Sequence, residues 1–72
     1  MTSDDWLARV AADLGVEPLA KTDDLLDLTR EIAHSLERRF GPLTLFLLGQ
    51  AVAAGGDRDV LVARLRAMLP AG

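Results

Sequence analysis

Apolar residues recur at intervals of three and four along this chain, in four segments that end at glycine or proline residues. This spacing places them on one side of an α-helix, and no segment alternates apolar and polar residues long enough for a strand. We therefore predict helices at residues 3–14, 22–40, 42–54 and 57–69, joined by short loops. The predicted fold class is all-α, as a small four-helix bundle or an orthogonal helical array, with one domain over residues 1–72.

Residues that favour helix starts support these boundaries. Thr2 or Ser3 stands at the start of the first segment, and Thr22 and Asp57 stand at the starts of the second and fourth. Side-chain oxygens at such positions accept hydrogen bonds from the first free N–H groups of a helix. The third segment begins near Pro42, whose missing N–H costs nothing in a first turn.

Apolar positions that share a helix face predict the hydrophobic core. The residues expected to be mostly buried are Trp6, Val10, Leu14, Leu25, Leu28, Ile32, Leu36, Phe46, Leu47, Leu61 and Leu65. A chain of this length buries only about 60% of its unfolded surface, so this core provides modest stability. Small domains often gain more by binding a partner.

The third segment differs from the others because it is apolar on all sides. A helix without a polar face must be covered all round, and three short helices do not suffice for that. We expect some of Leu45, Leu48, Val52 and their neighbours to stay exposed in a single copy or to be buried by a second chain, and we assign Leu45, Leu48 and Val52 as partner-binding residues. Trp6 is either a core anchor at the end of the bundle or a further partner-binding residue, since tryptophan is enriched in interface hot spots.

Composition narrows the class of protein. Half of the residues are hydrophobic and 26% are charged, which argues against a disordered chain. The chain has no cysteine, which excludes disulfides and thiolate metal sites within it. The net charge of −3 argues against a nucleic-acid partner. The apolar run at 43–54 is shorter than the roughly 20 residues of a membrane span, and the N-terminus lacks a secretory signal, so we expect a cytoplasmic protein without a membrane partner.

Charge is distributed unevenly along the chain. Residues 1–31 contain eight acidic and three basic residues, whereas residues 32–72 contain three acidic and five basic ones. The predicted basic patch, which would suit an acidic protein or a phosphate group, consists of Arg38, Arg39, Arg64 and Arg66, with Arg58 as a further candidate. The alternative is ordinary solvated surface, because arginines near helix ends favour the helix dipole and no aromatic residues are interleaved with them.

One pair of residues has the spacing of a metal site. Glu31 and His34 lie three residues apart, which places a carboxylate and an imidazole on one helix face. Complete sites of this kind need a second such pair and more carboxylates, which only two chains meeting at a dimer axis would supply. Most acidic residues stand at helix starts, where the dipole explains them. We therefore predict no catalytic residues, no metal ligands and no cofactor, and expect that the protein is not an enzyme.

Several stretches together resemble a known family. They are Asp13-Leu14-Gly15, Asp24-Leu25-Leu26-Asp27-Leu28, Ala33-His34 and Gly41-Pro42-Leu43-Thr44-Leu45-Phe46-Leu47-Leu48-Gly49. Across about residues 4–54 the chain resembles a small actinobacterial domain of unknown function. That domain occurs alone or attached to molybdenum-cofactor guanylyltransferases, often near formate dehydrogenase or its sulfur-carrier accessory protein. The resemblance implies a molybdoenzyme context, and it carries over no catalytic residue.

Three functions are consistent with these features. The first is a non-catalytic interaction module or accessory subunit that binds a larger protein, such as a molybdoenzyme or its maturation factor. The second is a self-associating bundle, in which a homodimer buries the third helix. The third is a small metal- or ligand-binding protein that uses Glu31 and His34.

Overall fold

Four α-helices make up the computed structural model, which describes residues 2–70. They are α1 (Ser3–Leu14), α2 (Thr22–Ser35), α3 (Phe40–Ala53) and α4 (Arg58–Met68). No strand occurs between residues 2 and 70. The predicted all-α fold class is therefore confirmed.

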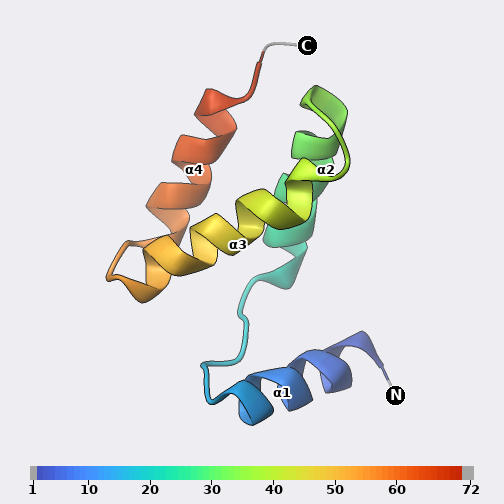
Figure 1. Cartoon of the computed structure of the whole chain (residues 1–72), viewed down its shortest axis with the longest axis vertical. Coiled ribbons are helices and arrows are strands. Elements are labelled where there is room, and N and C mark those ends of the chain that lie inside the picture. Colours follow the sequence, from blue (N-terminus) through green and yellow to red (C-terminus); the bar gives the residue numbers. More distant parts are fainter. Residues whose placement is uncertain (1, 71–72) are drawn as a thin grey trace.

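Three of the helices form the packed part of the molecule. α2 and α4 lie side by side with their N-termini at the same end, and α3 crosses both of them (Figure 1). α1 lies beyond the N-terminal end of α2, at the end of an extended connection (Figure 1). No Cα atom of α1 comes within 8 Å of a Cα atom in α2, α3 or α4. The described chain is thus a three-helix unit with a separate first helix.

The core of the three-helix unit is small and entirely apolar. Leu28 and Ile32 of α2, Leu48 of α3 and Val62 of α4 form its buried centre. Partly buried side chains surround them, namely Leu25, Leu45, Leu61, Leu65 and Leu69. Each helix contributes residues three or four positions apart, which is the spacing of a single helix face.

The predicted burial holds for α2 and partly for α4. Leu28 and Ile32 are buried, while Leu25, Leu61 and Leu65 are half-buried beside them. Val10 of α1 is half-buried as well. The prediction is wrong for five side chains that are exposed in the structure: Trp6, Leu14, Leu36, Phe46 and Leu47.

Each of these errors has a structural reason. Trp6 and Leu14 are exposed because α1 does not pack on the other helices. Leu36 follows the last residue of α2, where the backbone leaves the helical conformation at φ −125° and ψ −108°. Phe46 and Leu47 point outward because α3 turns its other side to the core.

A close approach between α2 and α3 determines which side of α3 faces inward. Gly41 in the first turn of α3 is buried against Thr29, and a Cβ atom at Gly41 would lie 2.8 Å from Thr29 Cγ2. The Thr29 hydroxyl donates to the Leu25 carbonyl over 2.9 Å, which fixes the direction of that methyl group. Leu45 and Leu48 follow Gly41 at intervals of four and three, so the same side of α3 meets the core.

Two predicted helix boundaries need correction. α2 ends at Ser35 rather than at Phe40, and α3 begins at Phe40 rather than at Pro42. Gly41 and Pro42 therefore lie inside the first turn of α3, where a proline needs no helical partner for its nitrogen. The predicted boundaries of α1 are confirmed, and those of α4 differ by one residue at each end.

The predicted caps hold at α1 and α4 but not at α2. The Thr2 hydroxyl accepts from Asp5 N over 3.1 Å, and Thr2 N donates to the Asp5 carboxylate, so both halves of a capping box are present. Asp57 accepts from Val60 N over 3.0 Å. Thr22, in contrast, is already helical, and Lys21 before it adopts the left-handed conformation at φ 55° without a side-chain cap.

Replacing a core leucine of α2 by alanine should destabilise the chain, whereas the same replacement of an exposed leucine on α2 should have little effect. We expect Leu28→Ala to lower the free energy of unfolding by about 2–4 kcal/mol, because it leaves a cavity in the core. Leu26→Ala is the matched control, since Leu26 is exposed on α2. Urea unfolding of both variants measures the difference, and equal losses would contradict the assigned core.

The contact between Gly41 and Thr29 can be tested with a pair of substitutions. We expect Gly41→Ala to cost about 1–3 kcal/mol because the new methyl group overlaps Thr29 Cγ2. Thr29→Ser removes that methyl group and keeps the hydroxyl, so Gly41→Ala should cost much less in its presence. Gly49→Ala serves as the control: no atom of another helix lies within 4 Å of its new Cβ, and alanine should stabilise the helix by about 0.5–1 kcal/mol. Equal effects at Gly41 and Gly49 in urea unfolding would contradict this packing.

Candidate functional site

The side of α3 that faces away from the core is apolar and exposed. Leu43, Phe46 and Leu47 have 58%, 70% and 65% of their surface exposed. Their intervals of three and one place them together on one side of the helix, opposite Leu45 and Leu48. We call Leu43, Phe46 and Leu47 the α3 face. α3 itself contains no charged residue, so the border of this face comes from other elements.

A shallow hollow adjoins the α3 face where α3 meets α4. Its volume is about 150 Å³, and Thr44, Leu47, Leu48, Ala51, Leu61, Arg64 and Leu65 line it. Leu47 thus belongs both to the exposed face and to the hollow, while Arg64 supplies a positive charge at its α4 side. This is an apolar surface with a basic border, and it offers contact area to another protein rather than an enclosed cavity.

The residues expected to bind a partner lie in different environments. Leu48 is only 6% exposed and forms part of the core, so its expected exposure is wrong. Leu45 packs beside it and is half-buried. Val52 is 36% exposed and Trp6 is 57% exposed. The structure does not bring Trp6 to α3, because the Cα atoms of α1 stay more than 8 Å from those of α3.

The arginines of the predicted basic patch do not all form an open surface: some are held in ion pairs, and others are exposed. Arg66 and Arg58 are held in ion pairs between α4 and α2, so they do not form an open basic surface. Arg39 pairs with Glu37 over 2.7 Å, and its guanidinium lies 5.2 Å from the centre of the Phe40 ring. Arg38 and Arg64 are exposed. Among residues 2–70, neither of them has an ion-pair partner.

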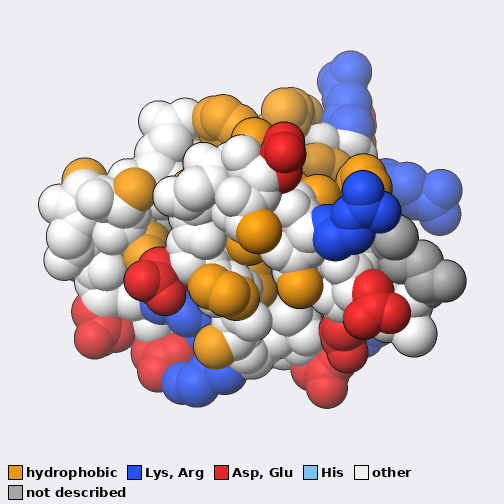
Figure 2. Space-filling view, turned by 90° about the horizontal axis from the view of Figure 1, so that it is seen from below, with side chains coloured by type: hydrophobic (Ala, Val, Ile, Leu, Met, Phe, Trp, Pro, Cys, Tyr) orange, Lys and Arg blue, Asp and Glu red, His pale blue; other side chains and the backbone are white. Residues whose placement is uncertain are grey.

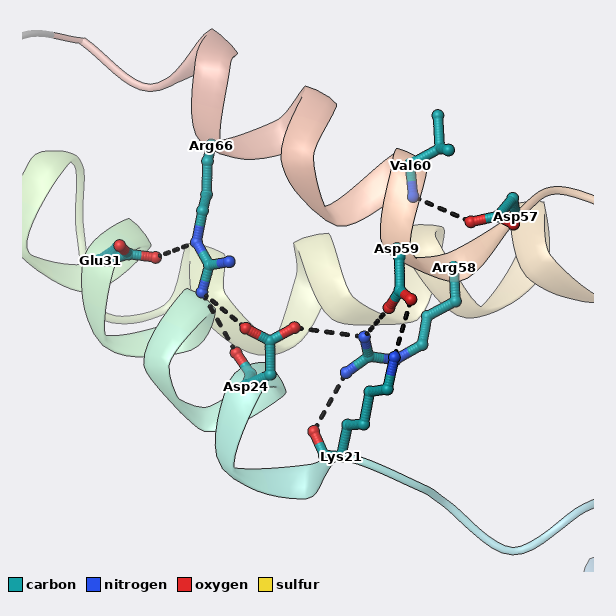
Figure 3. Close-up of polar contacts among 8 residues, drawn as sticks. All are labelled: Lys21, Asp24, Glu31, Asp57, Arg58, Asp59, Val60 and Arg66. Carbon is teal, nitrogen blue, oxygen red and sulfur yellow. Dashed lines mark hydrogen bonds and ion pairs between the residues drawn. The ribbon is translucent and has the colours of Figure 1, made fainter.

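Ion pairs join the start of α2 to α4 (Figure 3). The two Asp24 oxygens face Arg58 Nη1 at 3.2 Å and Arg66 Nη2 at 3.1 Å. Arg66 Nε also donates to the Glu31 carboxylate over 2.7 Å. Asp24 therefore joins the first and the last turn of α4, which fixes how α2 and α4 lie along each other.

The same group of charges holds the residue that precedes α2. Arg58 Nη2 donates to the Lys21 carbonyl over 3.0 Å. Lys21 Nζ lies 2.7 Å from the Asp59 carboxylate, which also accepts from Arg58 over 2.7 Å (Figure 3). The chain thus enters α2 at a point that is attached to the first turn of α4.

Hydrogen bonds to arginine and lysine lower the pKa of two of these carboxyl groups. The bond from Arg66 is the main cause that holds the pKa of Asp24 below its usual value of 3.8; partial burial opposes it, and Arg58 adds a second bond. Lys21 and then Arg58 lower the pKa of Asp59 in the same way. Glu31 and Asp24 raise the pKa of Arg66, so Arg66 stays charged at every relevant pH.

Glu31 and His34 both lie on α2, where each has a different environment. The Glu31 carboxylate is held by Arg66, and His34 is exposed near the end of α2. No cluster of three or more His, Cys, Asp or Glu side chains with metal-binding geometry occurs in the described part of the chain.

On the face seen from the α1 end, most acidic side chains lie in the lower half of the view. Apolar side chains appear at the upper edge and in the centre, with one acidic side chain among them (Figure 2). Within residues 2–70, no helix has both the length and the apolar character needed to cross a membrane.

These features define a small helical domain whose most prominent surface is an apolar helix face. The chain belongs to the family described as a domain of unknown function, DUF6457, whose model matches residues 1–71. No curated protein and no solved structure matches the chain significantly. The predicted membership of a family of small domains of unknown function is thus confirmed.

The ion pairs at Asp24 should make the stability of the chain depend on acidic pH. Because the folded-state pKa of Asp24 is below the usual value, its stabilising contribution is present above about pH 4 and is lost as the pH falls through the folded-state pKa. We expect Asp24→Asn to lower the melting temperature at neutral pH and to flatten its decline between about pH 4 and pH 2.

Asp23→Asn is the control for this change. Asp23 lies in the same first turn and carries the same charge, but it has no ion-pair partner among residues 2–70. Thermal melts followed by circular dichroism over this pH range compare the three proteins. Parallel pH profiles for the wild type and Asp24→Asn would contradict the role of these ion pairs.

Proposed function

We propose that the chain is a non-catalytic interaction module that binds a larger protein through the α3 face. The observation that supports this is the exposure of Leu43, Phe46 and Leu47, each of which leaves more than half of its surface in water. Complete burial of one leucine or phenylalanine side chain contributes about 1.5–3 kcal/mol. Contiguous apolar residues of this kind on a protein surface usually mark a binding site.

The border of the α3 face favours a partner with acidic groups around an apolar contact. Arg64 stands at the α4 side of the neighbouring hollow, and Arg38 and Arg39 precede α3. Charges around an apolar centre steer association and select the partner, while the centre contributes most of the affinity. We therefore expect Phe46 and Leu47 to contact the partner centrally and Arg38 and Arg64 to contact its acidic rim.

The partner belongs, in this proposal, to the assembly or maturation of a molybdoenzyme. The support is the resemblance of residues 4–54 to a domain that occurs alone or attached to molybdenum-cofactor guanylyltransferases and near formate dehydrogenase. A small non-catalytic helical chain fits the role of an accessory subunit there. The protein acts in the cytoplasm in this proposal.

Affinity capture from the native host tests the proposed function. The tagged wild type should retain a molybdoenzyme or one of its maturation factors, identified by mass spectrometry. Leu47→Glu should reduce that capture by about tenfold or more, as expected for a central interface side chain. Leu26→Glu is the matched control because Leu26 is equally exposed but lies on α2.

Circular dichroism shows whether each variant is folded before capture. Leu48→Glu is unsuitable for this purpose, because Leu48 is in the core and its replacement by a charge should unfold the chain. Equal capture by the wild type, Leu47→Glu and Leu26→Glu would contradict the α3 face as the binding surface. A partner unrelated to molybdoenzymes would contradict the proposed context.

A further inference from the structure

α1 carries a second apolar surface that no other helix covers. Trp6, Val10 and Leu14 follow one another at intervals of four, which aligns them along one side of the helix. Trp6 and Leu14 are 57% and 68% exposed. Because the Cα atoms of α1 lie more than 8 Å from those of the other helices, this side remains uncovered within one copy of the chain. We call Trp6, Val10 and Leu14 the α1 stripe.

The α1 stripe and the α3 face are both apolar, and the charges that surround them have opposite signs. Both are rows of large apolar side chains along one side of a helix, which suits the packing of one helix against another. Residues 3–17 carry four acidic residues, Asp4, Asp5, Asp13 and Glu17, against one base, Arg9. The α3 face has no acidic residue on its own helix and is bordered by Arg38 and Arg64. Packing of α1 on an α3 face would therefore bring an acidic helix to a basic border, and opposite charges favour association.

Lys21, the last residue of the connection, is fixed on α4, and α1 does not approach the α3 face of its own chain. Lys21 adopts the left-handed conformation, its carbonyl accepts from Arg58, and its ammonium group pairs with Asp59. These contacts fix the direction in which the chain enters α2. The α3 face of a second copy is accessible to α1 without breaking any of them.

We propose that two copies of the chain associate by exchanging their first helices, so that the α1 stripe of each copy packs on the α3 face of the other. In a two-fold symmetric pair this contact forms twice, and both uncovered surfaces of each copy are buried. The proposed dimer does not depend on the partner protein of the proposed function. It uses the same α3 face, so a partner with higher affinity would displace α1.

Light scattering and tryptophan fluorescence of the purified chain over a dilution series test the dimer. Trp6 is the only tryptophan and the chain has no tyrosine, so its emission reports the environment of α1 alone. We expect a dimer whose dissociation on dilution coincides with a red shift of Trp6 emission. Neither measurement involves another protein, so this proposal and the proposed function can fail separately.

Substitutions on the two surfaces identify which helices meet. Leu14→Glu on α1 and Leu47→Glu on α3 should each raise the dissociation constant by about tenfold or more. Leu26→Glu on α2 should leave it unchanged. Leu14 and Leu47 lie outside the core, so circular dichroism should show that both variants remain folded.

Mixing Leu14→Glu with Leu47→Glu provides the decisive comparison. Each variant alone has lost both contacts, whereas the mixed pair retains one contact between intact α1 and intact α3. Mixing should therefore restore association at a concentration where each variant alone is monomeric. Fluorescence energy transfer between differently labelled copies measures this recovery.

Three outcomes would overturn the exchange of α1. A dimer that Leu14→Glu leaves intact would mean that the α3 faces pair with each other. A monomer at every concentration with buried, blue-shifted Trp6 would mean that α1 folds back on its own chain. A monomer with exposed Trp6 throughout would mean that neither surface is used for self-association.

Discussion

The close approach of Gly41 to Thr29 is the constraint on which the arrangement of the three packed helices depends. Without a Cβ atom, the first turn of α3 lies directly against the methyl group of Thr29. This contact sets the rotation of α3 about its axis, because Leu45 and Leu48 then face α2 and α4. The same rotation turns Leu43, Phe46 and Leu47 outward. The contact at Gly41 thus determines which side of α3 faces the core and which side is exposed.

The charged contacts between α2 and α4 have a different role from the core. Asp24, Arg58 and Arg66 are partly exposed, and ion pairs in such positions contribute little to stability because water screens them. These contacts fix the positions of the helices. Asp24 joins the first and last turns of α4, and Arg58 holds the carbonyl of Lys21, the residue before α2. The core stabilises the three-helix unit, and the charges define how the chain enters it and where α1 is directed.

The sequence predicts those parts of the structure that local interactions determine. The boundaries of α1 follow from Thr2 and Gly15, whose cap and left-handed turn involve only neighbouring residues. The core side of α2 is also predictable, because one side of this helix is polar and the apolar side with Leu28 and Ile32 must therefore face the core. The rotation of α3 is not, because a helix that is apolar all round contains no pattern that separates its two sides. The interval of four between Gly41 and Leu45 indicates which side of α3 faces the core. It can be used only if Gly41 is known to lie inside the helix, and the sequence predicts a helix start at Pro42.

Tertiary contacts, which the sequence does not reveal, explain the other differences between the predicted and the observed surfaces. Arg58 and Arg66 look like members of a basic patch in the sequence, and only the placement of α4 beside α2 pairs them with Asp24 and Glu31. The separation of α1 cannot be predicted either, since Trp6 and Leu14 have the spacing of core residues. In both cases the local pattern identifies the side chains that form contacts, but not the element or the molecule that they contact.

The outer side chains of α3 contribute little to the stability of the single chain. More than half of the surface of Leu43, Phe46 and Leu47 remains in water, so polar residues at these positions would serve the packing of α2, α3 and α4 equally well. They would also make the isolated chain more soluble. Folding of one copy therefore does not require an apolar α3 face. Association with another polypeptide would use it, and this is the physical reason to propose that side of α3, rather than the charged contacts around Asp24, as the binding surface.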